Sequence, residues 1–211
     1  MKTIVALTAL AGVIVVSQPS WAATPTDQLR EYTEHVLNVL EDPALKSEER
    51  KPARRAAVRK VAVEAFDVQE TARRALGPHW QARTPAEREE FVLLFAELLE
   101  ETYISRIDYF GGERLRFVSE KIDGEYASVR AHVITRQGTE VPVDARMLRR
   151  GERWLIYDVV IENVSLINNY RAQFDRIIRS ASYGELVKRL KSRTEPTEAP
   201  KPDAKPRRTS R

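Results

Sequence analysis

The sequence predicts an α+β fold in which a layer of helices packs on a concave, four-stranded antiparallel sheet. Two observations support this prediction. Apolar residues recur at helical spacing through residues 27–109 and again through 166–190, whereas residues 115–164 show short alternating segments separated by turns that contain glycine. Helices followed by a strand meander and closed by further helices are typical of a single α+β domain.

The clearest local signal opens the longest predicted helix. Thr84 is suited to the N-cap, Pro85 to the first helical position and Glu87 to the reciprocal contact of a capping box. This helix is expected to continue to about residue 109. Earlier helices are expected from an N-cap at Thr26-Asp27 to about 41, over 47–66, and from a capping box at Asp67 to residue 76.

Four strands are expected to form a meander joined by short turns. Their predicted ranges are 115–122, 126–135, 140–148 and 153–164. The last of these is apolar on both faces, so we expect it to be covered on both sides. The small residues Ala127, Ala131 and Ala145 share one face, where they either admit a closely packed helix or leave a cavity.

The first 22 residues have the three parts of a secretory signal peptide. Lys2 supplies the positive charge, Ile4–Val16 the apolar stretch, and Ser20 and Ala22 the small residues of a cleavage site. We place the cut after Ala22, with Ala23 as the alternative. A membrane anchor is the competing interpretation, but a span requires roughly 20 apolar residues. Export from the cytoplasm is therefore expected.

The positive charge of the chain is concentrated in its last 21 residues. Residues 191–211 contain seven basic and three acidic residues, which accounts for the whole formal net charge of +4. This segment is rich in proline and has no Leu, Ile, Val or aromatic residue, so it is expected to be disordered. We expect it to be a solubilising tail; contact with an anionic membrane surface is the alternative. The predicted domains are thus 1–22 (signal peptide), 23–190 (globular α+β domain) and 191–211 (tail).

Residues suited to catalysis or metal binding are scarce. There is no cysteine, and His35, His79 and His132 lack the spacing of metal ligands. Asp158 lies inside an apolar strand, where it is either a general base with a raised pKa or a structural acid paired with Arg171 or a backbone amide. The structural role is favoured. We therefore expect no enzyme, no metal and no cofactor.

Several ordered motifs resemble the periplasmic phospholipid-binding (toluene-tolerance, MlaC-type) family. The first set is Trp154-Leu155-Ile156-Tyr157-Asp158-Val159, Ile161-Glu162-Asn163-Val164-Ser165-Leu166, and Asn169-Tyr170-Arg171 with Phe174. The second set is Phe66-Asp67, Ala75-Leu76-Gly77 with Trp80, and Thr84-Pro85 followed by Phe91 and Phe95. The resemblance covers about residues 27–190. Asn163 departs from the family, which commonly has Gly there, although Asn also tolerates a left-handed turn.

The resemblance implies a fold, a cargo and partners. The fold is an NTF2-like cone whose helices and curved sheet enclose a deep apolar pocket, and the small strand residues then favour a cavity. The cargo is a phospholipid held by its acyl chains and carried between outer and inner membranes to maintain outer-membrane lipid asymmetry. The partners are an outer-membrane lipoprotein–porin complex and an inner-membrane ABC transporter with a lipid-binding substrate domain. Nucleic acid is not expected as a partner.

The residues expected to line the acyl pocket come from helices and strands alike. They are Phe95, Leu98, Ile107, Val129, Val143, Val159, Tyr170 and Phe174. Two other functions remain open on the sequence alone. One is a carrier of another apolar lipid, such as a hopanoid; the other is an enzyme on a similar scaffold that uses Asp158, or less plausibly Asp108, as its base.

Overall fold

The computed structural model describes residues 23–104 and 112–192. Its α-helices are α1 Pro25–Glu41, α2 Lys51–Ala65, α3 Val68–Leu76, α4 Pro85–Tyr103, α5 Leu166–Ser180 and α6 Tyr183–Lys191. Its strands are β1 Arg114–Asp123, β2 Tyr126–Ile134, β3 Glu140–Arg150, β4 Arg153–Ile161 and β5 Val164–Ser165. The predicted signal peptide, residues 193–211 of the predicted tail, and the predicted site residue Ile107 lie outside the described residues. Lys191, assigned to the tail on sequence, ends α6.

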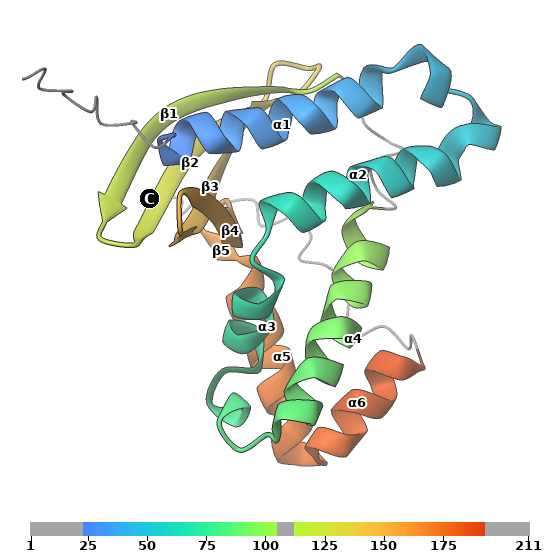
Figure 1. Cartoon of the computed structure of the whole chain (residues 1–211), viewed down its shortest axis with the longest axis vertical. Coiled ribbons are helices and arrows are strands. Elements are labelled where there is room, and N and C mark those ends of the chain that lie inside the picture. The colour runs from blue at the N-terminus through green and yellow to red at the C-terminus, as the bar shows by residue number, and fades with distance from the viewer. Residues whose placement is uncertain (1–22, 105–111, 193–211) are drawn as a thin grey trace, which may run out of the picture.

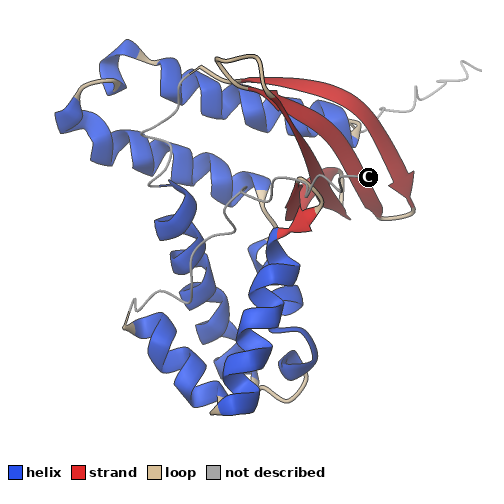
Figure 2. Cartoon of the chain, turned by 180° about the vertical axis from the view of Figure 1, so that it is seen from behind, coloured by secondary structure: helices blue, strands red, loops and turns tan. Residues whose placement is uncertain are grey.

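The strands form one antiparallel sheet in the order β1-β2-β3-β4-β5. The α+β prediction is confirmed, with one short strand more than expected. Helices α1 and α2 lie together over one face of the sheet, which we call the inner face (Figure 1). Helices α3 to α6 form a separate group below the sheet, and α3 and α5 join it to β4 (Figure 2). We call these two parts the upper and lower lobes.

The extra strand arises where the fourth predicted strand is interrupted. Glu162 and Asn163 have positive φ angles of 49° and 68°, so the chain reverses there and Val164–Ser165 pairs back on β4. Asn163 adopts the left-handed conformation that its position requires and that asparagine tolerates better than most residues. The sheet also has a bulge in β1 between Phe117 and Ser119.

The predicted N-cap of α4 is confirmed, whereas that of α1 is wrong. Thr84 and Glu87 form the predicted reciprocal capping box of α4. The predicted cap of α1 at Thr26 is wrong, because Thr24 caps the helix and forms a capping box with Asp27. Thr26 instead donates from its backbone N–H to Glu120 of β1 at 3.0 Å, so a carboxylate from the sheet lies at this helix N-terminus.

Two more predicted helix starts differ in detail. The helix expected over residues 47–66 begins with a short 3₁₀ turn, Glu48–Arg50, before α2. Asp67 caps α3 as predicted, but the capping box is incomplete. The carboxylate of Glu70 contacts Arg73 and Arg74 instead of the cap backbone.

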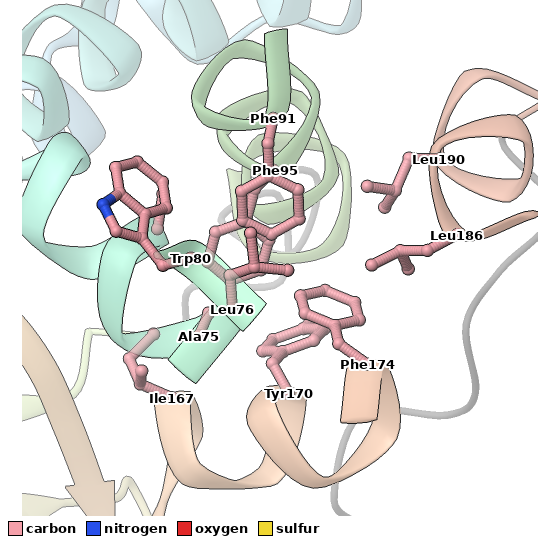
Figure 3. Close-up of a cluster of buried hydrophobic side chains, with 11 residues drawn as sticks. Ala75, Leu76, Trp80, Phe91, Phe95, Ile167, Tyr170, Phe174, Leu186 and Leu190 are labelled. Atoms are coloured by element: carbon pink, nitrogen blue, oxygen red, sulfur yellow. The ribbon is translucent and has the colours of Figure 1, made fainter. Parts of the chain in front are cut away.

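The buried apolar residues form two separate clusters. The lower-lobe core is built on Phe91, Phe95 and Phe174, whose rings lie 5.4–5.8 Å apart in stacked and edge-to-face pairs (Figure 3). The upper-lobe core lies between the inner face and helices α1 and α2. Its members are Leu29, Tyr32, Ala65, Ala127, Val129, Ala145, Met147, Trp154 and Ile156. Each lobe therefore has its own hydrophobic centre.

Asp158 of β4 connects the two lobes. Its carboxylate accepts hydrogen bonds from Ser165 Oγ at 2.7 Å and from the backbone N–H of Ile167 at 3.1 Å, in the first turn of α5. Arg146 Nη1 of β3 lies 3.1 Å from the same carboxylate. The predicted backbone-amide partner is thus present, but Arg171 is not the cation. The side chain of Arg171 lies over Gly77, where a Cβ would approach Arg171 Cδ to 2.8 Å.

Asp67 makes the second connection, at the start of α3. Its side chain accepts from the backbone N–H of Glu70 at 2.9 Å and from Arg150 Nε of β3 at 2.7 Å. Its backbone N–H donates to the carbonyl of Ile156 in β4 at 2.9 Å. The backbone N–H of Asp67 and the carboxylate of Asp158 therefore hold the N-termini of α3 and α5 against β4, while the Asp67 carboxylate adds a contact to β3.

We predict that Asp158→Asn destabilises the protein by about 2–3 kcal/mol, because it removes a buried charge that satisfies three donors. Urea unfolding followed by tryptophan fluorescence measures this change. Asp175→Asn is the matched control, since Asp175 also contacts a cation but lies near the surface. An equal change in both variants would contradict the connecting role of Asp158.

We also predict a pH-dependent contribution from Glu70. Burial raises its pKa, but hydrogen bonds from Arg73 and Arg74 outweigh this effect and hold the pKa below the usual 4.5. A lowered pKa in the folded state stabilises the protein above the unfolded-state value, and this stabilisation is lost as the pH falls through the folded-state value. Glu70→Gln should therefore destabilise the protein at pH 7, and the difference from wild type in urea midpoint should shrink as the pH falls below 4.5. A difference independent of pH would refute this account.

Candidate functional site

The predicted lining residues do not lie around one common point. Phe95 and Leu98 of α4 and Tyr170 and Phe174 of α5 belong to or pack on the lower-lobe core. Val129 and Val159 belong to or pack on the upper-lobe core, and Val143 of β3 lies on the same inner face, half-buried. Six of the seven described residues are thus divided between the two cores.

Three of these residues are closely packed on all sides. Phe95, Val129 and Phe174 have no solvent-accessible surface, so no space large enough for a water molecule adjoins them. Tyr170 is only 5% exposed, and its ring packs edge-on against Phe95 at 5.2 Å. These side chains belong to the packed interior of the two lobes.

Leu98, Val143 and Val159 are in a different environment. Each is only half-buried, so each keeps apolar surface that no described side chain covers. Similar half-buried apolar residues continue along α4 and α5, namely Leu99, Tyr103, Leu166 and Ile177. Half-buried apolar surface extending from the last turns of α4 is suited to contact an apolar ligand, because its burial is favourable by about 25 cal/mol per Å².

The small residues of β2 and β3 have a simpler explanation than a cavity. Ala127 and Ala145 pack with Leu29 and Tyr32 of α1 in the upper-lobe core. Ala131 is also buried, at 2% exposure. The small size of Ala127 and Ala145 therefore admits the closely packed helix α1. This is one of the two alternatives given by the sequence, and it is the one that these residues favoured before the family resemblance was considered.

A polar residue that sequence reasoning missed lies on α5 beside the aromatic core. Within the described part of the chain, Gln173 Oε1 is buried and has no hydrogen-bond partner, while its amide nitrogen donates to Asn169 at 3.3 Å. A buried acceptor without a donor costs about 1–3 kcal/mol. Asn169 and Gln173 are four residues apart and adjoin the predicted Tyr170 and Phe174. That i, i+4 polar pair was the available sequence signal.

The described residues include no group of acidic, histidine or cysteine side chains suited to a metal ion. His79 contacts Asp175 at 2.8 Å and His132 contacts Glu140 at 2.7 Å, in separate parts of the structure. Asp158, the candidate base, already accepts the contacts that join the lobes. No helix among the described residues has the length and apolar character needed to cross a bilayer.

A surface hollow of about 500 Å³ lies along α6. Its lining residues are Gly184, Val187, Lys188, Lys191 and Ser192. It contains none of the predicted residues and only one sizeable apolar side chain, so it does not fit acyl chains.

The chain resembles one known protein in sequence and another in its solved structure. One relative, the intermembrane phospholipid transport system binding protein MlaC of Haemophilus influenzae, is 22% identical over 122 residues, which are 56% of this chain and 57% of that protein. The chain thus matches little more than half of that relative's length. A solved structure of a phospholipid-binding protein from Ralstonia solanacearum, in complex with a phospholipid, shares the fold with a TM-score of 0.68 and 24% identity. The match covers 79% of this chain and 94% of that structure.

A family comparison covers more of the sequence. The family described as MlaC protein matches residues 30–192, from α1 to the end of α6. This range includes nearly all of both lobes and all the motifs on which the resemblance rests. The chain therefore belongs to the MlaC family.

Proposed function

We propose that the protein is a periplasmic carrier that binds a phospholipid by its acyl chains and moves it between the inner and outer membranes. Membership of the MlaC family is the observation that carries this proposal. The names of the two relatives, one a phospholipid transport protein and the other a phospholipid complex, support the same cargo.

A carrier of this kind has to bury a large apolar surface of its lipid. A two-chain phospholipid has roughly 30 methylene groups, and each gains about 0.8 kcal/mol when it leaves water. Free lipid therefore does not cross an aqueous compartment at a useful rate. A carrier has to supply apolar surface for the chains and needs no catalytic group, which agrees with the half-buried residues of α4, α5 and the inner face.

We assign the direct acyl contacts to Leu98, Val143 and Val159. Phe95, Val129, Tyr170 and Phe174 then form the packed layer behind the site. Ile107 stays a prediction. We further propose that the carrier maintains outer-membrane lipid asymmetry by exchanging cargo with an outer-membrane lipoprotein–porin complex and with an inner-membrane ABC transporter that has a lipid-binding substrate domain.

The identity of the cargo gives the most direct test. Protein purified without detergent from the periplasm should yield phospholipid on organic extraction, identified by mass spectrometry and quantified per protein. Recovery of a hopanoid, or of no lipid from well-folded protein, would contradict the proposed cargo.

The proposed lining predicts the effect of filling the site. Leu98→Trp and Val143→Phe should each lower the phospholipid recovered per protein several-fold, because the added volume occupies space proposed for the chains. Leu93→Trp is the matched control, since Leu93 lies on the same helix and is 66% exposed. Thermal melting identifies variants that fail to fold. Full retention of lipid by both folded variants would show that the acyl chains lie elsewhere.

A further inference from the structure

Four ion pairs on the outer face of the sheet and the adjoining α3 share one orientation, in which the acid is largely buried and the arginine is exposed. The Arg116–Glu140 pair, farther along the same face, differs because both of its side chains are exposed. The four pairs are Arg130–Asp144, Arg146–Asp158, Arg150–Asp67 and, on the adjoining α3, Arg73–Glu70. The acidic side chains are 3–20% exposed, whereas the arginine side chains are 42–54% exposed. The surface therefore presents cations, although the pairs themselves are neutral. We call Arg73, Arg130, Arg146 and Arg150 the arginine face.

The strand register brings the sheet members of this face together. Arg130 of β2 pairs with Asp144 of β3, and Ser128 pairs with Arg146, so Arg130 and Arg146 are diagonal neighbours. Residues in that relation have Cα atoms about 7–8 Å apart. Arg150 follows on the same side of β3 and reaches Asp67 at the start of α3, the helix that carries Arg73.

The helices leave part of this surface exposed. α1 and α2 pack on the inner face, whereas α3 and α5 meet the outer side at β4, and Asp67 at the start of α3 reaches Arg150 of β3 (Figures 1 and 2). Tyr126, at the start of β2, is 45% exposed beside the arginine face. Tyrosine and arginine are both enriched at protein–protein interfaces.

The arginines keep donors available for a further partner. A guanidinium has five N–H groups. Arg146 uses Nη1 for Asp158, and Arg150 uses Nε for Asp67. Hydrogen bonds to the acids raise the pKa of Arg73, Arg130 and Arg150, so they stay charged. Because the acids already fix these side chains, binding a second anion costs less side-chain entropy.

We propose that the arginine face is a docking surface for an acidic patch on a protein partner. Guanidiniums bind carboxylates through paired, bidentate hydrogen bonds, and several carboxylates linked in one polypeptide can reach several of the arginines together. The head groups of a fluid membrane are not linked to one another. This proposal concerns a partner protein rather than the lipid cargo, and it rests only on the positions and contacts of the arginine side chains.

The test compares two double variants that remove the same charge. R73Q/R130Q removes half of the arginine face and leaves Glu70 paired with Arg74. R179Q/R189Q removes two arginines from exposed i, i+4 pairs on α5 and α6. The full mature chain is titrated against poly-L-glutamate and, separately, against phosphatidylglycerol vesicles. We expect R73Q/R130Q to weaken binding to poly-L-glutamate about tenfold, and the control about twofold or less.

Two results would overturn the proposal. Equal weakening in both variants would assign the binding to net charge or to residues elsewhere. Weakening confined to the vesicles would identify an anionic lipid surface as the occupant. If melting shows that R73Q/R130Q is unfolded, Ser128→Glu replaces it, since this change puts a negative charge beside Arg146 without removing an ion pair. It should weaken poly-L-glutamate binding to a similar extent, and unchanged binding would count against the docking surface.

Discussion

The contact between Asp158 and the start of α5 is the interaction on which the arrangement of the lobes depends. A carboxylate on β4 accepts from Ser165 and from the backbone of Ile167, while Arg146 balances its charge. Burial of an unpaired carboxylate would be costly, so the position of α5 is closely specified relative to the sheet. Since α5 carries Tyr170 and Phe174, this contact also sets the position of the lower-lobe core.

Asp67 positions α3 in a similar way, because its backbone N–H bonds to Ile156 of β4 and its carboxylate accepts from Arg150 of β3. Polar contacts therefore help to hold the lower lobe on β4, while each lobe has an apolar core of its own. Half-buried apolar residues, among them Leu98 and Val159, pack on these cores and keep part of their apolar surface exposed. In our proposal these surfaces contact the acyl chains.

The sequence predicted the features that depend on neighbouring residues. The capping box at Thr84 and the order of helices and strands follow from local chemistry and periodicity, whereas the reversal at Asn163 falls inside the strand predicted over 153–164. The cap of α1 was placed two residues late, because Thr24 and Thr26 are both suitable caps and only Thr24 is followed directly by a proline at the first position. The cation beside Asp158 could not be deduced, since Arg146 reaches it through strand pairing rather than sequence proximity.

The candidate site was harder to predict for a related reason. Phe95 and Leu98 are apolar residues of one helix, and periodicity treats them alike. Only the tertiary structure shows that Phe95 is fully enclosed whereas Leu98 is not. Glutamine 173 was missed because a polar residue beside an apolar stripe is usually exposed, and its burial depends on the packing of other segments.

The presence of two separate cores has a consequence for local stability. Proteins open in cooperative units that often coincide with such clusters, and each unit has its own free energy of opening. Helices α4 and α6 pack within the lower lobe, so their amide protons can exchange with solvent through an opening that leaves the paired strands β2 and β3 protected. Opening of one lobe therefore does not require the other to unfold, and the two halves of the chain can differ in how often they open.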